Sequence, residues 1–175
     1  MAQRDVEPFE RLVLPHLDDA YTLARYLLRN EHDAQDVVQD AVLRALRYFD
    51  GFRDGDARAW LLAIVRNCCL TWHHRHRADR VTINLSDAED SPQLQGSGEA
   101  DALAIRSSER AKIDRALAEL PIEFREVVIL RELQEMSYKE ISTVTGVPIG
   151  TVMSRLARAR KRLAVSLGMH VREAS

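Results

Sequence analysis

Apolar residues recur at intervals of three or four along most of this chain, as they do on the buried face of an α-helix. The interval first appears at Leu17, Tyr21, Ala24 and Leu28, and Leu27 widens the stripe. No alternation of apolar and polar residues is long enough for a useful β-strand, and the nearest is the short, isolated VTINL. The pattern therefore predicts an all-α fold.

A second stripe lies in DAQDVVQDAVLRAL, where we expect Asp33 to be the N-cap because its carboxylate can accept bonds from free amides. FDGFRDGD then breaks the pattern with two glycines and three aspartates, so it predicts a loop. ARAWLLAIVRNCCLTWHHRH resumes a helix that is apolar around most of its circumference, with Trp60 expected in the core. Together these segments predict a helical domain over residues 1–79. The second stripe consists of Val37, Val38, Ala41, Val42, Ala45 and Leu46.

The helical pattern stops in the segment 80–101. SDAEDSPQLQGSGEAD is rich in Ser, Asp, Glu, Gly and Pro, and it has too little apolar surface to offset the entropy of ordering. From Val81 to Asp101 there are five acidic residues and no basic one. We therefore expect an acidic flexible linker between the first domain and a second helical domain at 102–175.

In the second domain, Ile113, Leu117 and Leu120 predict a helix that Pro121 ends, and EFREVVILREL predicts the next one. The sequence SYKEISTVTGVPIGTVMSRLARARKRL then carries the signals of two helices joined by a tight turn. These helices complete an all-α molecule of two small domains.

The tight turn has the features of a helix-turn-helix. Ser137 and Glu140 have capping-box spacing, and Gly146 provides the backbone freedom that a sharp turn needs. Val147 is expected to fill the angle between the helices, and Pro148 suits the first turn of the second helix. The apolar stripe of that second helix consists of Val152, Leu156, Ala159 and Leu163.

The exposed face of the second helix is basic although the whole chain has a net charge of −2. Residues 149–163 contain five cations and no acid. Arginine can read guanine edges in a major groove, and the other cations can neutralise phosphates, so the helix is predicted to bind DNA. A helical hairpin with a basic face that only meets solvent is the alternative. The candidate DNA-binding residues are Thr151, Ser154, Arg155, Arg158, Lys161 and Arg162.

A cluster of cysteine and histidine raises the question of a metal or redox site. Cys68 and Cys69 adjoin each other, which does not favour a disulfide, and residues 73–76 hold three histidines. Cys69 and His73 are four residues apart, yet they make only two ligands of a tetrahedral site. Packing of the cysteines, and contact of the histidines with DNA phosphates, are the alternatives, and we expect no metal and no cofactor.

Other classes of protein receive little support. The sequence has no phosphate-binding glycine loop and no nucleophile–base motif, so we do not expect an enzyme. No stretch approaches the ~20 apolar residues that would cross a bilayer, and no signal sequence begins the chain. We expect no membrane insertion and a cytoplasmic protein.

Two segments carry a specific resemblance. DAQDVVQDAVLRALRYFDGFRDGDARAWLLAIVRNCC resembles region 2 of the extracytoplasmic-function (group 4) sigma factors of the sigma-70 family. LAELPIEFREVVILRELQEMSYKEISTVTGVPIGTVMSRLARARKRL resembles region 4 of the same factors, and the two occur in the family's order. The resemblance implies an alternative sigma factor that binds core RNA polymerase and directs promoter-specific initiation. A helix-turn-helix regulator that acts without polymerase is the alternative.

The resemblance also implies the polymerase contact. Asp36, Gln39 and Asp40 share one polar helix face, and they match family positions that contact the clamp helices of the polymerase largest subunit. A purely solubilising role is the alternative. The family further implies an anti-sigma factor as a partner.

For the −10 element, the family captures a base extruded from the melted non-template strand, and Phe52 and Asn67 match the pocket positions with Ile64 and Arg66 nearby. A core position for Phe52 and a surface amide for Asn67 are the alternatives.

For the −35 element, Ser154, Arg155 and Arg158 match contacting positions, while Met153 and Ala157 depart from the longer polar or aromatic residues of other members. These departures affect the expected DNA sequence and leave the docking mode unchanged. Ser142 stands where alanine is usual, and its hydroxyl is expected to be tolerated.

Overall fold

The computed structural model describes residues 6–82 and 100–169, which form helices joined by short turns and no strand. The all-α prediction is confirmed for this part of the chain. The elements are α1 (Glu7–Val13), η1 (Leu14–His16), α2 (Leu17–Leu28), α3 (Glu31–Tyr48), η2 (Phe49–Gly51), α4 (Ala57–Thr82), α5 (Ala100–Glu119), α6 (Ile122–Val128), the π-helical turn η3 (Ile129–Leu133), α7 (Tyr138–Thr145) and α8 (Ile149–Ser166).

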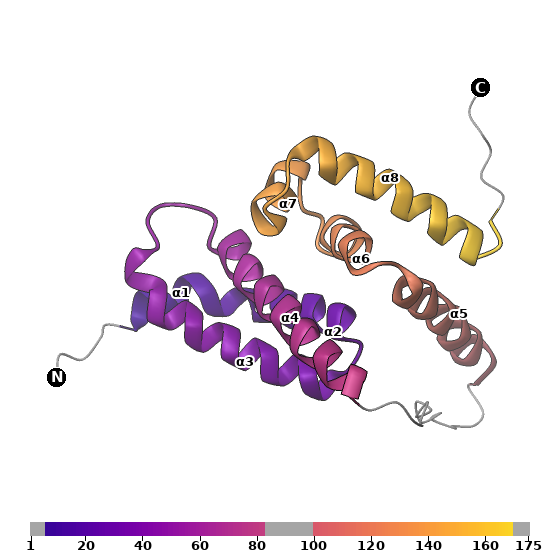
Figure 1. The fold of residues 1–175 in the computed structure, drawn as a ribbon, viewed down its shortest axis with the longest axis horizontal. Coiled ribbons are helices and arrows are strands. Elements are labelled where there is room, and N and C mark those ends of the chain that lie inside the picture. Colours follow the sequence, from indigo (N-terminus) through magenta and orange to yellow (C-terminus); the bar gives the residue numbers. More distant parts are fainter. Residues whose placement is uncertain (1–5, 83–99, 170–175) are drawn as a thin grey trace.

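Helices α1–α4 form the N-terminal group (Figure 1). α2, α3 and α4 pack on one another, and α1 lies against α4. The predicted stripes supply part of the buried side chains of α2 and α3, while α4 contributes Leu61, Leu62 and Val65. In the α2 stripe, Leu17 and Tyr21 are only half-buried, and the predicted stripes left out the buried residues Ala20, Leu23 and Ala34. The apolar spacing in the sequence therefore identified only part of the packing face of each helix.

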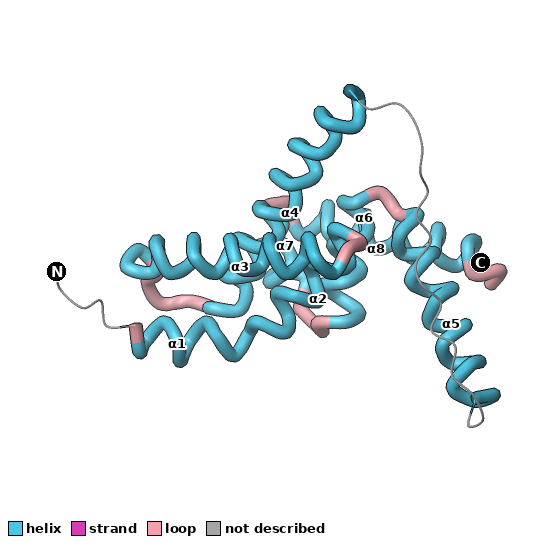
Figure 2. The backbone as a smooth tube through the Cα atoms, turned by 90° about the horizontal axis from the view of Figure 1, so that it is seen from below, coloured by secondary structure: helices cyan, strands magenta, loops and turns pink. Residues whose placement is uncertain are grey.

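Helices α5–α8 form the C-terminal group, in which α6 and α7 pack against α8 (Figure 1). The C-terminal end of α4 and the N-terminal part of α5 project from the body in different directions (Figure 2). Among the described helices, none combines the length and the apolar character that a membrane crossing requires.

The two groups share a continuous core. α4 packs on α7, and α2 packs on α6 and η3. Leu27 and Leu62 of the first group belong to the same buried cluster as Ile129, Met136 and Ile141 of the second. The two groups are thus in direct contact, an arrangement that the sequence pattern did not predict.

The N-cap of α3 differs from the prediction. Asn30, not Asp33, caps this helix: its side-chain oxygen accepts bonds from the N–H groups of His32 at 2.9 Å and Asp33 at 3.0 Å. Arg29 adopts a left-handed conformation with φ of 61° at the end of α2. The chain reverses there, so α3 begins earlier and Asp33 lies in its first turn.

The other differences concern the predicted linker, residues 80–101, and the helix that follows it. Ile113 is 47% exposed, because α5 packs through its C-terminal end, where Ala116, Leu117 and Leu120 are buried. α4 continues to Thr82, and α5 begins at Ala100, so both ends of the predicted linker are helical. The remainder of that linker, residues 83–99, lies outside the described residues, and the division at 79 and 102 stays a prediction.

Candidate nucleic-acid interface

The turn between α7 and α8 has the predicted geometry. The hydroxyl of Ser137 accepts the N–H of Glu140 at 3.2 Å, and the carboxylate of Glu140 accepts the N–H of Ser137 at 2.6 Å. This main-chain donor holds the pKa of Glu140 below its usual value. Gly146 has a φ of 72°, a left-handed conformation that suits glycine. The capping box and the glycine turn together make a helix-turn-helix.

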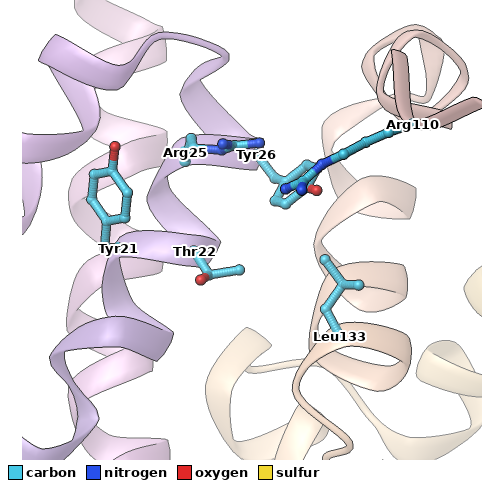
Figure 3. A pocket seen from close by; sticks show the side chains of 6 residues that line it. All are labelled: Tyr21, Thr22, Arg25, Tyr26, Arg110 and Leu133. Carbon is cyan, nitrogen blue, oxygen red and sulfur yellow. The ribbon is translucent and has the colours of Figure 1, made fainter. Parts of the chain in front are cut away.

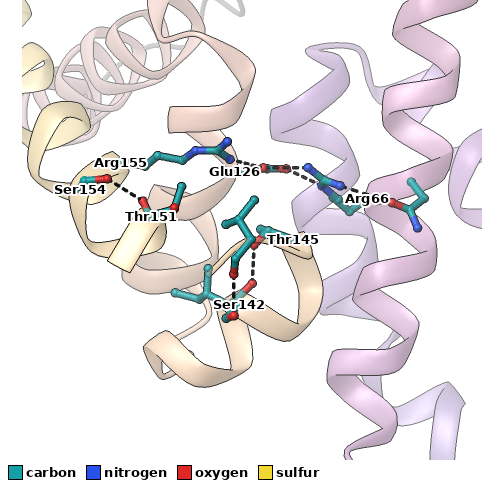
Figure 4. A network of polar contacts seen from close by, with 10 residues as sticks. Arg66, Glu126, Ser142, Thr145, Thr151, Ser154 and Arg155 are labelled. Carbon is teal, nitrogen blue, oxygen red and sulfur yellow. Dashed lines mark hydrogen bonds and ion pairs between the residues drawn. The ribbon is translucent and has the colours of Figure 1, made fainter. Parts of the chain in front are cut away.

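Two side chains brace this turn beyond the predicted features (Figure 4). The hydroxyl of Ser142 donates to the carbonyl of Val147 at 2.6 Å. The hydroxyl of Thr145 donates to the carbonyl of Ile141 at 2.7 Å. Ser142 is therefore accommodated by a bond across the turn, which explains why this hydroxyl fits the first helix.

The second helix, α8, points its apolar stripe inward. Val152, Leu156 and Ala159 are buried as predicted, and Leu163 is half-buried. The candidate DNA-binding side chains divide into two classes of exposure. Thr151 and Arg155 are half-buried, whereas the exposed members are Ser154, Arg158, Lys161 and Arg162.

Contacts within the protein engage part of the basic face. The guanidinium of Arg155 lies 3.5 Å from a carboxylate oxygen of Glu126. Arg162 lies over the ring of Phe124, 5.1 Å from its centroid. Arg158 and Lys161 are exposed on the same helix. Arg160, also on α8, pairs with Glu132 at 2.6 Å. The helix thus offers exposed cations together with two arginines that carboxylates already hold.

The loop residue Phe52 joins an aromatic cluster at the start of α4. Its ring stacks on Phe49 with centroids 5.9 Å apart, and it contacts Trp60 at 4.9 Å. Trp60 and Phe52 are both half-buried, and Trp60 packs against the core. Ile64 and Asn67 follow Trp60 at helical spacing, so they continue one face of α4 from the aromatic cluster to an exposed amide.

The side chain of Arg66 points toward Glu126 of α6 in the C-terminal group. Its Nε and Nη2 donate to the carboxylate of Glu126 at 2.8 and 3.1 Å, and its Nη1 lies 3.4 Å from the side-chain oxygen of Asn67 (Figure 4). The side chain of Glu126 is only 1% exposed. Arg66 of the N-terminal group and Arg155 of the C-terminal group therefore share one buried carboxylate.

Glu126 is the functional candidate that the sequence analysis missed. It stands in EFREVVIL, immediately before four apolar residues. Val127, Val128, Ile129 and Leu130 are all buried. An acid that adjoins such a run can be a buried carboxylate that needs a cation, although the sequence does not say which cation.

The face of α3 predicted to meet polymerase is open to solvent. Asp36, Gln39 and Asp40 are all exposed, and Asp40 pairs with Arg44 at 2.9 Å. Leu43 lies one turn beyond on the same face and is 59% exposed. Leu43 thus adds one exposed apolar side chain to this candidate face, and single exposed leucines are common on protein surfaces.

The cysteine and histidine cluster has other partners. Both cysteines are buried, and burial raises the pKa of Cys69 to about 12, which keeps its thiol protonated. His73 Nε2 lies 2.7 Å from the carbonyl oxygen of Leu27. His76 stacks on Trp72 with centroids 3.8 Å apart. In the described residues, no three metal-ligating side chains come together.

A shallow pocket of about 280 Å³ lies between α2 and the C-terminal group (Figure 3). The hydroxyl of Tyr26 donates across this seam to Asp114 at 3.3 Å. No predicted site residue is among the side chains that line the pocket, which are Tyr21, Thr22, Arg25, Tyr26, Arg110 and Leu133.

Comparison with protein families finds two matches in order. Residues 12–80 match the model of Sigma-70 region 2, and residues 110–163 match the model of Sigma-70, region 4. The second match contains the helix-turn-helix, and the first contains the acidic face of α3 and the aromatic cluster.

Several curated proteins are similar over most of this chain. The ECF RNA polymerase sigma factor SigM of Mycobacterium tuberculosis H37Rv is 37% identical over 161 residues, covering 91% of this chain and 77% of the relative. SigE of Mycolicibacterium smegmatis is 33% identical, covering 98% of this chain, which spans 66% of that relative. The ECF sigma-E factor of Escherichia coli K12 is 30% identical, with coverage of 91% and 86%.

Two solved structures have a similar fold. The sigma factor RpoE of Bartonella quintana, in complex with the anti-sigma factor NepR, has a TM-score of 0.72 and 28% identity, covering 93% of this chain and 98% of that one. CnrH, in complex with the cytosolic domain of CnrY, has a TM-score of 0.68 and 28% identity, with coverage of 94% and 90%.

Proposed function

Because the chain belongs to the extracytoplasmic-function RNA polymerase sigma factors, we propose that its two helical groups divide the work of promoter-specific initiation. Its partners are core RNA polymerase and promoter DNA. The observation that carries the proposal is an α7–α8 helix-turn-helix with exposed cations, joined in one chain to a bundle that matches region 2. A regulator acting without polymerase is not favoured, because it would not need that bundle.

The C-terminal group docks on the −35 element. α8 enters the major groove, where Arg158 is placed to reach a base edge and Lys161 to neutralise a phosphate. Ser154 lies one turn before Arg158 and Thr151 two turns before it, near the start of the helix, where a recognition helix meets base edges.

The N-terminal group binds core polymerase and the −10 element. The exposed acids of α3 suit arginines on the clamp helices, and Leu43 adds apolar contact area. The aromatic cluster supports Phe52 beside the α4 face that carries Ile64 and Asn67, where a flipped base can stack and bond. Two weak DNA contacts in one molecule act through effective concentration.

The family also supports proposals for a regulatory partner, the cellular location and the kind of activity. The similar sigma factor of Bartonella quintana is bound to an anti-sigma factor, so an anti-sigma factor is the proposed regulator of this chain. Its proposed place of action is the cytoplasm, where polymerase works. The proposed role is that of an initiation factor and not of an enzyme.

The direct test is run-off transcription with purified core polymerase on a pooled promoter library, with and without the protein. Defined new start sites that share −35 and −10 elements are expected. No new start sites, together with tight binding of the protein alone to duplex DNA, would overturn the proposal in favour of a simple regulator.

Two sets of substitutions test the division of labour. Ser154→Ala with Arg158→Ala is expected to reduce promoter use and leave core binding intact. Asp36→Ala, Gln39→Ala and Asp40→Ala together are expected to weaken core binding and leave duplex binding by α8 intact. Equal loss of core binding by both variants would contradict the assignment.

A further inference from the structure

Glu126 lies where the two DNA-reading surfaces meet inside the molecule (Figure 4). Its carboxylate receives a two-point contact from Arg66, assigned above to the −10 surface, and a longer contact at 3.5 Å from Arg155, assigned to the −35 surface. With 1% of its side chain exposed, this carboxylate requires a cation at all times.

The two partners of Glu126 differ in where they are anchored. Arg155 belongs to α8, which packs on α6 in the same group as Glu126, whereas Arg66 belongs to the other group. If the groups separate, Arg66 leaves and Arg155 remains beside the carboxylate. Breaking most buried ion pairs is costly because it leaves one charge buried without a partner. Separation of the groups avoids this cost at Glu126, because Arg155 stays beside the carboxylate.

The polar contacts between the two groups join specific partners, and one buried hydrogen-bond acceptor among them has no donor in the described part of the chain. Arg58 pairs with Asp19 at 2.6 Å and donates to the carbonyl of Gln134 at 2.7 Å, and the Gln134 amide donates to the carbonyl of Asp19 at 2.8 Å. Within the described residues, the side-chain oxygen of Gln134 is buried without a partner. Separation would hydrate this acceptor, which favours opening.

We propose that Glu126 is a shared positioning residue that holds the free protein closed, so that Arg66 reaches promoter DNA only after the carboxylate has released it. The inference rests on the proposed function, because it takes Arg66 and Arg155 to be DNA-reading residues. While the groups are closed, the apparent affinity of the free protein for DNA is reduced in proportion to the open fraction.

Glu126→Gln is the test because it keeps the shape and removes the charge. Glu132→Gln is the matched control: it removes one charge from the same group, and Glu132 pairs with Arg160 of α8 in an exposed ion pair at 2.6 Å. Small-angle X-ray scattering of the free protein measures compaction. Binding to a promoter fragment with a preopened −10 region measures access of both surfaces to DNA.

Glu126→Gln is expected to increase the radius of gyration and to tighten DNA binding by the free protein about 5- to 150-fold, the range of typical couplings between sites. The control is expected to change neither quantity to a similar degree. Equal effects of both variants, or unchanged compaction and affinity for Glu126→Gln, would overturn the inference.

A second variant covers the case in which Glu126→Gln fails to fold. Arg66→Gln leaves Glu126 its Arg155 partner. Only scattering is measured for this variant, because Arg66 is itself assigned to DNA binding. An increased radius of gyration would support the inference that the Arg66–Glu126 contact holds the free protein closed, and an unchanged radius would overturn it. Run-off transcription by the wild type separates the two ideas. Defined starts with unchanged compaction would overturn only the inference, whereas absent starts would overturn the proposed function.

Discussion

Ser137 determines where α7 begins, because its hydroxyl and the Glu140 carboxylate each satisfy an amide that the helix leaves free. Asn30 does the same for α3 with two amides. Both effects act within three residues of the chain. In α3 and α7, the helix start is therefore determined by a single side chain.

Ser137→Ala is expected to lower the free energy of unfolding by about 1 kcal/mol, since the N–H of Glu140 loses its acceptor. Urea unfolding followed by circular dichroism measures the change. Ser108→Ala, at an exposed position within α5, is the control and should stay within about 0.5 kcal/mol. A loss no larger than that of the control would show that the cap is dispensable.

His73 couples stability to pH. Burial lowers its pKa, and the nearby cations Arg125 and Arg77 lower it further. Its pKa in the unfolded chain is about 6.5, so below that pH the unfolded state binds more protons than the folded state. The stability contributed by neutral His73 is present above about pH 6.5 and is lost as the pH falls.

The wild type should therefore lose more unfolding free energy between pH 7 and pH 5 than His73→Gln does. Urea unfolding at both values measures the difference. His74→Gln, an exposed neighbour, should follow the wild type. If all three proteins show the same pH dependence, His73 is not the titrating group.

At the scale of elements, α8 carries an exposed apolar stripe as well as cations. Ile149 is 44% exposed and Met153 52%, and Ala157 continues the stripe at helical spacing. Apolar side chains in a major groove contact the methyl groups of thymine. We therefore expect Met153 and Ala157, the two positions that depart from the family pattern, to favour a thymine in the proposed −35 element.

Single thymine-to-uracil replacements across the −35 element test this idea. One replacement is expected to weaken wild-type binding about fourfold, the equivalent of one buried methyl group. Met153→Ala should be insensitive to that replacement. Val165→Ala, 71% exposed at the far end of α8, should behave like the wild type. Sensitivity retained by Met153→Ala would exclude a methyl contact.

At the scale of the whole molecule, Arg125 ties the two groups together. It is buried, and its guanidinium donates to the last carbonyls of α5 and to the carbonyls of Tyr26 and Leu27 in α2. Burial lowers its pKa to about 10, so it remains charged at neutral pH. One side chain therefore caps two helix ends from different parts of the sequence.

Arg125→Ala is expected to lower the free energy of unfolding by at least about 3 kcal/mol, because several buried carbonyls lose their donor. Arg125→Lys keeps the charge without the fork of donors and should recover part of the loss. Arg115→Ala, an exposed control in α5, should cost about 0.5 kcal/mol or less. Equal losses for Arg125→Ala and Arg115→Ala would show that the capping of α2 adds nothing.

The sequence by itself determined the features that depend on neighbours a few residues apart. The stripes of α2, α3 and α8, the capping box and the left-handed Gly146 follow from helical periodicity and local hydrogen bonding. The exposed acids of α3 and the exposed cations of α8 lie on the helix faces that the apolar stripes leave to solvent. The sequence alone favoured Asp33 over Asn30 as the cap of α3, because the side chains of both residues can accept bonds from free amides.

Only the tertiary structure decided how the two groups meet. Arg66 and Glu126 are 60 residues apart, and Arg125 and Tyr26 are 99 apart. Such pairs have no period in the sequence, since any buried carboxylate could take any of many arginines. Their choice depends on which helix faces remain after each group has packed, and this packing brought the two candidate DNA-reading arginines to one carboxylate.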